Sequence, residues 1–261
     1  MNGVMGMIGL LLDTKLDKQQ RHWAIVARDS AEALLAIIND ILDFSKIEAG
    51  RIEIERIAFS PSALASSVES LLGPKACAKG LRFSLTASPH LPDWVTGDPT
   101  RWRQVLINLI GNAIKFTSTG SIRINIDWHL DATDDGRLAV TVADTGIGLS
   151  PEAAGRLFGK FVQADQSISR RFGGSGLGLA ISRELVERMG GRIGLESEEG
   201  KGSRFWYWIP APIAEAPAAA PVRANAVDES VKPLRILVAE DNQVNQMVIQ
   251  SVLSRQGHAV D

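Results

Sequence analysis

Two asparagines and a lysine lie at spacings that could hold a metal–phosphate group. Asn108 and Asn112 are four residues apart in an expected helix that starts at Pro99, and Lys115 follows about one turn later. Residues four apart project from the same side of a helix. Amide oxygens suit Mg²⁺, and an ammonium group pairs with phosphate. Solvated or capping asparagines would give the same spacing, so this pattern needs support from other motifs.

An acidic residue and two glycines follow an expected strand that ends near residue 143. Asp144, Gly146 and Gly148 are spaced two apart. Such a sequence is compatible with a plain turn. It is also compatible with a carboxylate that accepts a hydrogen bond from an exocyclic amine, while the glycines allow a ligand to approach the backbone.

A glycine-rich segment precedes the expected helix at residues 180–189. Residues 172–179 read Phe-Gly-Gly-Ser-Gly-Leu-Gly-Leu. Glycines that lead into a helix N-terminus expose backbone N–H groups to an anion. The segment lacks the Gly-Lys-Ser/Thr of a Walker A loop and the Gly-x-Gly-x-x-Gly of dinucleotide-binding folds, which disfavours both. A second glycine motif, ending at Ser203, connects two expected strands, where a tight hairpin is the simple alternative.

The elements that must position these residues alternate between strands and helices. Ser60, Asp98 and Ser150 each stand directly before a proline, which predicts a capped helix start at all three places. Alternating apolar residues predict strands over 51–59, 81–87, 121–130, 137–143, 192–198 and 203–209. Short connections between consecutive strands favour a mixed sheet with helices on one face over a doubly wound parallel sheet.

The first 50 residues predict two helices, and the second has the pattern of a bundle seam. Ala27, Leu34 and Ile41 recur every seven residues between positions 18 and 46. One helical hairpin cannot cover such a stripe. A hairpin from a second subunit would complete a four-helix dimer bundle, and packing against the chain's own next domain is the alternative.

The C-terminal part of the chain divides into a linker and a short folded segment. Residues 211–233 are rich in Ala and Pro without periodicity, which predicts a linker. Residues 234–239 then predict a strand, which the acidic pair Glu240 and Asp241 and a helical pattern follow. Twenty-eight residues are too few for an independent domain.

Composition excludes several functional classes. The net charge of −2 and the absence of a long basic run argue against a nucleic-acid surface. The single cysteine, Cys77, excludes an internal disulfide framework and fits a reducing compartment. The longest apolar stretch, residues 4–12, is too short to span a bilayer. We therefore expect a cytoplasmic fragment, with membrane contact only through other parts of a longer protein.

Taken in order, these motifs resemble the ATP-binding domain that histidine kinases share with DNA gyrase and MutL. Two segments are similar to the sequences of histidine kinases in particular, namely Asn-Ala-Ile-Lys-Phe-Thr and Gly-Ser-Gly-Leu-Gly-Leu. The resemblance covers residues 51–210. Residues 1–50 resemble part of the dimerisation hairpin without its histidine motif, and residues 234–261 resemble the start of a receiver domain. That order is typical of a hybrid sensor histidine kinase.

The resemblance implies an α+β fold, in which a two-layer α/β sandwich with a mixed sheet follows a helical hairpin and precedes a truncated receiver. It also implies ATP and Mg²⁺ as ligands. The implied nucleotide-site residues are Asn108, Asn112, Lys115, Asp144, Gly146, Gly148, Arg171 (or Arg170), Gly174, Gly176, Leu177, Gly178 and Ser203. Among them, Asn112 would coordinate Mg²⁺ and act in catalysis with Lys115, and Asp144 would bind the adenine amine. Residues 160–171 would form a mobile lid. Glu240 and Asp241 would be the receiver's acidic metal pair.

The implied reaction transfers the γ-phosphoryl group of ATP to a histidine and onward in a phosphorelay. The implied partners are a second copy, through the hairpin, and a receiver domain or response regulator. None of the four histidines, His22, His90, His129 and His258, stands in the family's acceptor motif. We therefore expect ATP binding without self-phosphorylation. An ATP-gated binding module and a structural scaffold are the alternatives.

Overall fold

The computed structural model describes residues 2–130, 136–159, 176–216 and 233–261. It divides into two compact units, one formed by residues 1–39 with 220–261 and the other by residues 40–219. The second unit contains every described residue of the expected nucleotide site.

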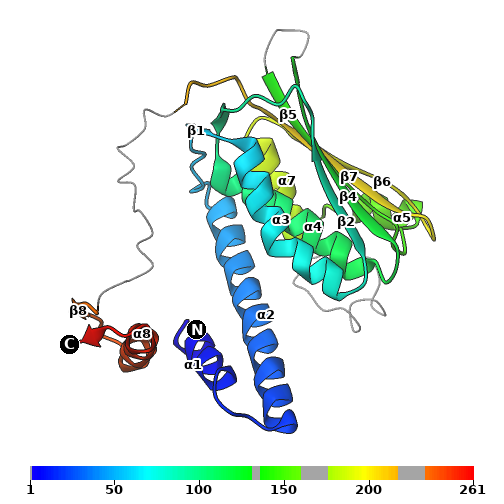
Figure 1. Cartoon of the computed structure of the whole chain (residues 1–261). Coiled ribbons are helices and arrows are strands. Elements are labelled where there is room, and N and C mark those ends of the chain that lie inside the picture. The colour runs from blue at the N-terminus through cyan, green and yellow to red at the C-terminus, as the bar shows by residue number, and fades with distance from the viewer. Residues whose placement is uncertain (1, 131–135, 160–175, 217–232) are drawn as a thin grey trace. The chain divides into compact units, whose positions relative to one another are not determined.

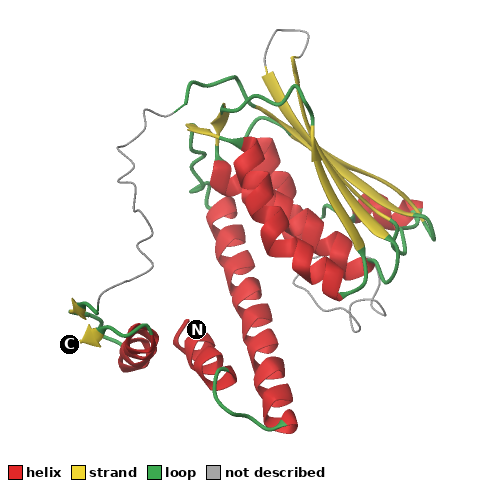
Figure 2. Ribbon diagram, viewed as in Figure 1, coloured by secondary structure: helices red, strands yellow, loops and turns green. Residues whose placement is uncertain are grey.

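A five-stranded mixed sheet forms one layer of the second unit. Its strands are β2 (Arg82–Ala87), β4 (Ser121–Leu130), β5 (Gly136–Asp144), β7 (Gly202–Pro210) and β6 (Arg192–Glu198), in that spatial order. Strands β2 and β4 pair in parallel, and the other pairs are antiparallel. Helices α3 (Pro61–Ala78), α4 (Pro99–Phe116) and α7 (Gly178–Arg188) cover one face of the sheet (Figures 1 and 2). The predicted α+β fold with a mixed sheet is confirmed.

Three helices begin where a capping side chain precedes a proline, as predicted. They are α3 (Pro61–Ala78), α4 (Pro99–Phe116) and α5 (Pro151–Arg156). In each, the side chain of the preceding residue accepts a hydrogen bond from the backbone N–H three residues later. Helix α7 (Gly178–Arg188) instead starts from the glycine-rich segment, with Leu177 at the N-cap position and no side-chain cap.

The expected strand over residues 51–59 is mostly wrong. Only β1 (Ile57–Phe59) forms a strand, and it pairs with β3 (Val95–Gly97), which the sequence pattern does not predict. The segment before it is held differently, because Ile52 is buried and the Glu55 N–H donates to Asp98 Oδ2 at 3.0 Å. Its alternating pattern therefore reflects packing on the core rather than a strand ladder.

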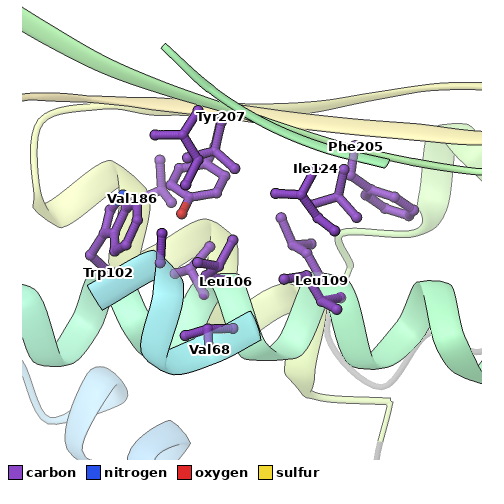
Figure 3. Close-up of a cluster of buried hydrophobic side chains, with 14 of the residues drawn as sticks. Val68, Trp102, Leu106, Leu109, Ile124, Val186, Phe205 and Tyr207 are labelled. Carbon is purple, nitrogen blue, oxygen red and sulfur yellow. The ribbon is translucent and has the colours of Figure 1, made fainter. Parts of the chain in front are cut away.

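Helix α4 fixes the base of the site because its apolar side is fully buried. Leu106 and Leu109 face Ile124, Phe205 and Tyr207 of the sheet, as Figure 3 shows. Both leucines are 0% exposed. Core side chains at native density are held in single positions, so the polar side of α4 is presented in a defined orientation.

The other helices and strands lie outside this sheet. Helix α1 spans Asn2–Leu12, and the long helix α2 spans Lys18–Glu48, across the boundary between the units. Strands β8 (Arg235–Ile236) and β9 (Ala259–Val260) pair in parallel, with α8 (Gln243–Arg255) between them in sequence. Strand β8 is shorter than the strand expected over 234–239, and β9 is an addition.

The end of α2 belongs to the second unit. Gln104 Nε2 donates to Asp43 Oδ2 at 2.7 Å, and Arg188 Nη2 donates to the carbonyl of Ile47 at 3.0 Å. Ile47 joins the buried core. None of the described helices has the length and apolarity needed to cross a bilayer.

Candidate nucleotide-binding site

A chain of side-chain hydrogen bonds orders the asparagines on α4. Asn108 Nδ2 donates to Ser182 Oγ on α7 at 2.8 Å, and Asn112 Nδ2 donates to Asn108 Oδ1 at 3.4 Å. Both amide nitrogens are therefore directed toward protein acceptors. Among the described residues nothing donates to Asn112 Oδ1, so this oxygen has the chemistry of a cation ligand.

Lys115 places a cation one turn beyond Asn112. Its Nζ lies 4.9 Å from the centre of the Phe116 ring. Partial burial lowers the pKa of Lys115, because desolvation disfavours the charged form. A phosphate bound nearby would offset that cost, so the position suits an anionic ligand.

Asp144 ends strand β5 in the middle of the sheet, where it pairs in register with Ile122 on β4 and Ser203 on β7. It is only 9% exposed. Burial raises the pKa of its carboxyl group, while the N–H groups of Gly146 and Ser203 and the hydroxyl of Thr117 act in the opposite direction. Gly146 N–H donates to Asp144 Oδ1 at 2.8 Å.

Glycines in the expected motifs stand where an added Cβ would come too close to other atoms of the chain. Gly148 has a positive φ of 63°, and a Cβ there would lie 1.9 Å from the carbonyl oxygen of Glu198. A Cβ on Gly178 would lie 2.6 Å from Asn108 Oδ1. Because Gly178 starts α7, the glycine-rich segment ends directly against the asparagine side of α4. The structure thus brings two separate sequence motifs together.

The remaining expected residues are only partly described. Gly176 has a φ of 69° and precedes the buried Leu177. Ser203 Oγ lies 2.9 Å from Ser197 Oγ on the neighbouring strand β6. The structure does not describe residues 160–175, so the whole of the expected lid, residues 160–171 with Arg170 and Arg171, and the flanking Gly174 lie outside the described residues.

The acidic pair Glu240 and Asp241 lies in the other unit, just before α8. Glu240 Oε1 accepts from Asn245 Nδ2 at 3.0 Å and from the Asn242 N–H at 3.2 Å. These hydrogen bonds, that from Asn245 first, lower the pKa of Glu240. Within the described part of the chain, no three His, Cys, Asp or Glu side chains gather as a metal site.

Two site residues were missed by sequence reasoning. Ser182 completes the hydrogen-bonded chain from Asn112, and Thr117 lies next to Asp144. The weak signal for Ser182 is a polar residue on an otherwise apolar side of α7. The signal for Thr117 is its place as the last residue of the Asn-Ala-Ile-Lys-Phe-Thr motif, residues 112–117.

Known protein families match two parts of this chain. Residues 97–213 match the family described as Histidine kinase-, DNA gyrase B-, and HSP90-like ATPase, and residues 1–50 match the His Kinase A (phospho-acceptor) domain. The first match contains α4, Asp144, α7 and Ser203 in the order observed here. The chain belongs to the histidine kinase family. The resemblance found in the sequence is thereby confirmed.

Several known proteins are similar to this chain over most or all of its length. Sensor histidine kinase AruS of Pseudomonas aeruginosa is 40% identical over 260 residues, which are 100% of this chain and 26% of that protein. Sensory/regulatory protein RpfC of Xanthomonas campestris is 38% identical, over 100% of this chain and 39% of that protein. The crystal structure of full-length ShkA in complex with AMPPNP matches with a TM-score of 0.66 and 35% identity, over 99% of this chain and 51% of ShkA. The chain thus spans about a quarter to a half of these proteins.

Proposed function

We propose that this chain is the ATP-binding catalytic portion of a hybrid sensor histidine kinase. One observation carries the proposal: the asparagine side of α4 directly contacts the glycine start of α7 through Asn108 and Gly178. We infer from this contact that the amide oxygens, Lys115 and the N-terminus of α7 surround one site. Each of these groups suits a nucleotide triphosphate.

The adenine end of the nucleotide is assigned to Asp144. Its carboxylate is buried, and one oxygen already accepts from the Gly146 N–H. A buried carboxylate that gains a further donor is stabilised in its charged form. The 6-amino group of adenine supplies such a donor, whereas guanine presents a carbonyl oxygen at that place. Asp144 therefore selects ATP over GTP.

The phosphate end is assigned to Asn112 and Lys115. The residues fit Mg²⁺, because the Asn112 oxygen accepts from no described residue and is aimed away from Asn108 by the hydrogen bond of its own nitrogen. When bound, Mg²⁺ would neutralise charge on the phosphate oxygens. Lys115 would hold the phosphates by charge and hydrogen bonding. We expect Asn112→Ala to weaken Mg²⁺-dependent binding more than Asn108→Ala does.

The proposed reaction is displacement at the γ-phosphorus. A histidine nitrogen forms a bond to phosphorus while the bond to the bridging β–γ oxygen breaks, and ADP leaves with that oxygen. Such transfer depends mostly on alignment and on neutralisation of charge. Both functions come from rigid parts of this chain, since α4 and β5 are fixed by the core.

We further propose that the chain forms a homodimer through α2 and transfers phosphate to a receiver domain or a response regulator. Leu34 and Ile41 on α2 are 49% and 50% exposed, and their seven-residue spacing suits a helical bundle. Residues 234–261 are assigned to the start of a receiver domain, with Glu240 and Asp241 as its acidic pair.

Nucleotide titration tests the binding assignment. The wild-type chain is expected to bind Mg²⁺-ATP at least tenfold more tightly than Mg²⁺-GTP. Asp144→Asn should abolish most of that preference, and the exposed Asp127→Asn on β4 is the matched control. The unliganded Asp144→Asn variant should be no less stable at neutral pH, because burial raises the pKa of Asp144 and its ionised form is therefore costly in the folded state. Equal affinity for ATP and GTP would refute the assignment.

Phosphoryl transfer tests the activity. This chain is expected to bind ATP without labelling itself, because its histidines lack the acceptor motif and His22 lies exposed on α2. With radiolabelled ATP and a separately supplied phosphoacceptor domain, acid-labile and base-stable label should appear on that domain. Tight ATP binding with no transfer in this mixture would instead support a nucleotide-gated binding module.

A further inference from the structure

The hydroxyl of Thr117 is a buried polar group that lacks a hydrogen bond of normal geometry among the described residues. Thr117 is 0% exposed, and its Oγ1 makes no hydrogen bond of normal geometry with any described residue. A buried hydroxyl without a partner is costly, and most buried polar side-chain atoms in folded proteins are paired. The described residues contain two others, Trp102 Nε1 and Tyr207 Oη, but both belong to the apolar core seen in Figure 3. Only Thr117 lies at the candidate site.

The backbone around Thr117 holds this hydroxyl in place. Thr117 is the C-cap residue of α4, with extended φ and ψ of −99° and 119°, and its N–H donates to the carbonyl of Ala113 at 3.1 Å. The preceding carbonyl, of Phe116, lies only 2.6 Å from where a Cβ on Gly146 would stand. The end of α4 is therefore packed directly against the turn that follows Asp144.

Thr117 acts on Asp144 at close range. Its hydroxyl lowers the pKa of the Asp144 carboxyl group, against the larger opposite effect of burial. The Gly146 N–H occupies Oδ1 of the same carboxylate at 2.8 Å. A carboxylate has about four acceptor sites on its two oxygens, so it can accept from Thr117 and from a ligand amine as well.

We propose that Thr117 is a positioning residue for nucleotide selection, and that its hydroxyl donates to the Asp144 carboxylate when a 6-aminopurine nucleotide is bound. This inference rests on the proposed role of Asp144 in ATP binding. The Thr117 hydroxyl and the Gly146 N–H together fix the rotation of the carboxylate plane. The remaining acceptor site then meets the 6-amino group without a loss of side-chain freedom on binding.

A purely structural role for Thr117 makes a different prediction. Removal of a structural hydroxyl would change the stability of the fold and would weaken all nucleotides to the same extent. A positioning role weakens only the nucleotide that carries the amine. Purine riboside triphosphate, which lacks the 6-amino group, separates the two.

The experiment measures Mg²⁺-nucleotide affinity by calorimetry for the full chain and for Thr117→Val, which keeps the volume and removes the hydroxyl. We expect Thr117→Val to bind ATP about three- to tenfold more weakly, with unchanged affinity for the purine riboside analogue. Thr117→Ser keeps a hydroxyl and should retain most of the ATP affinity. In an Asp144→Asn background, Thr117→Val should have no further effect on ATP.

Three results would overturn the inference. These are equal weakening of both nucleotides by Thr117→Val, unchanged ATP affinity in that variant, and equal weakening of ATP binding by Thr117→Ser and Thr117→Val. If Thr117→Val does not fold, Thr117→Ala is compared with Thr117→Ser by the same measurements. A wild-type chain that binds ATP no better than the analogue would refute the role of Asp144 itself, and this inference with it. A wild-type chain with that preference but no effect of Thr117→Val would refute the inference alone.

Discussion

Helices α2 and α4 carry similar stripes of apolar residues, but the two stripes differ in burial. Leu106 and Leu109 on α4 are fully buried against the sheet, whereas Leu34 and Ile41 on α2 are about half exposed. Sequence periodicity identifies both stripes equally well. The difference shows that a stripe becomes a rigid support only where the same chain covers it, as α4 is covered beneath the candidate site.

The same difference in burial is seen between two parts of α2. Its last turns are packed within the second unit, where Asp43 accepts from Gln104 and Ile47 joins the core. The stripe around Leu34 has no comparable cover among the described residues. Apolar surface of this kind is commonly an interaction site, which supports a second copy of α2 as its partner.

The largest expected effect is loss of assembly. The double variant Leu34→Glu with Ile41→Glu places two charges in the expected seam, and each is costly to bury without a partner. We expect sedimentation of the wild-type chain at tens of micromolar to show a dimer and the variant to be a monomer that still binds ATP.

A matched control puts the same charges on the other side of α2. Ala36→Glu with Asn39→Glu adds two glutamates at exposed positions roughly opposite Leu34 on the helix. This control should remain dimeric. A monomeric wild-type chain, or equal dissociation of both double variants, would contradict the proposed seam.

The second-largest expected effect is on stability, and it compares a buried leucine on α4 with an exposed leucine on α2 in the monomeric variant. In the Leu34→Glu, Ile41→Glu background, Leu106→Ala should lower the free energy of unfolding by about 2–5 kcal/mol, because it leaves a cavity in a closed core. Leu42→Ala should cost less than about 1 kcal/mol, since Leu42 is already 52% exposed. Urea unfolding followed by tryptophan fluorescence measures both. Similar losses would mean that α2 is covered within its own chain.

Local chemistry made much of this fold predictable. The starts of α3, α4 and α5 follow from a capping oxygen before a proline, because both preferences act within one turn. The three-residue pair of β1 with β3 was missed, and residues 51–56 were wrongly expected in a strand. Whether an alternating segment finds a ladder partner depends on the rest of the fold, which local pattern does not contain.

The candidate site was likewise only partly predictable from the sequence. The side of α4 that carries Asn108 and Asn112 follows from helical spacing alone. The contact of Asn108 with Ser182 and the approach of Thr117 to Asp144 join segments that are far apart in the chain. Such neighbours depend on how α7 and β5 pack against α4, so they emerge only from the structure.

An intermediate effect on stability is expected from two aspartates that contact α4, namely Asp98 at its N-cap and Asp43 on α2. Asp98 is 2% exposed and accepts from the N–H groups of Arg101 and Glu55 at 2.9 and 3.0 Å. Its replacement by alanine should destabilise the unit by about 2–3 kcal/mol, because a helix cap and a second buried hydrogen bond are lost. Asp43 on α2 is more exposed, and Asp43→Ala should cost about 1 kcal/mol or less. Thermal unfolding of both variants in the monomeric background checks the order, and equal losses would contradict it.

The smallest effect concerns a polar atom on the sheet that covers α4. The Tyr207 hydroxyl is buried among apolar side chains (Figure 3) and has no hydrogen-bond partner among the described residues. Tyr207→Phe keeps the ring and removes the unpaired oxygen, so the free energy of unfolding should stay the same or rise by up to about 1 kcal/mol. A loss above about 1 kcal/mol would show that the hydroxyl is satisfied, for example by an internal water.

The pH dependence of the unfolding free energy of Tyr207→Phe is a second, independent test of the burial of this hydroxyl. Burial raises the pKa of Tyr207 well above its usual range, so the folded state holds this proton more tightly than the unfolded state. Stability from this group is therefore fully present below about pH 10, the usual tyrosine pKa, and is lost as the pH rises above it. Because Tyr207 is the only tyrosine in the chain, Tyr207→Phe should flatten the alkaline fall in unfolding free energy relative to wild type. Parallel curves for the two proteins above pH 10 would show that the hydroxyl ionises as readily in the folded chain as in the unfolded one, which would contradict its burial beneath α4.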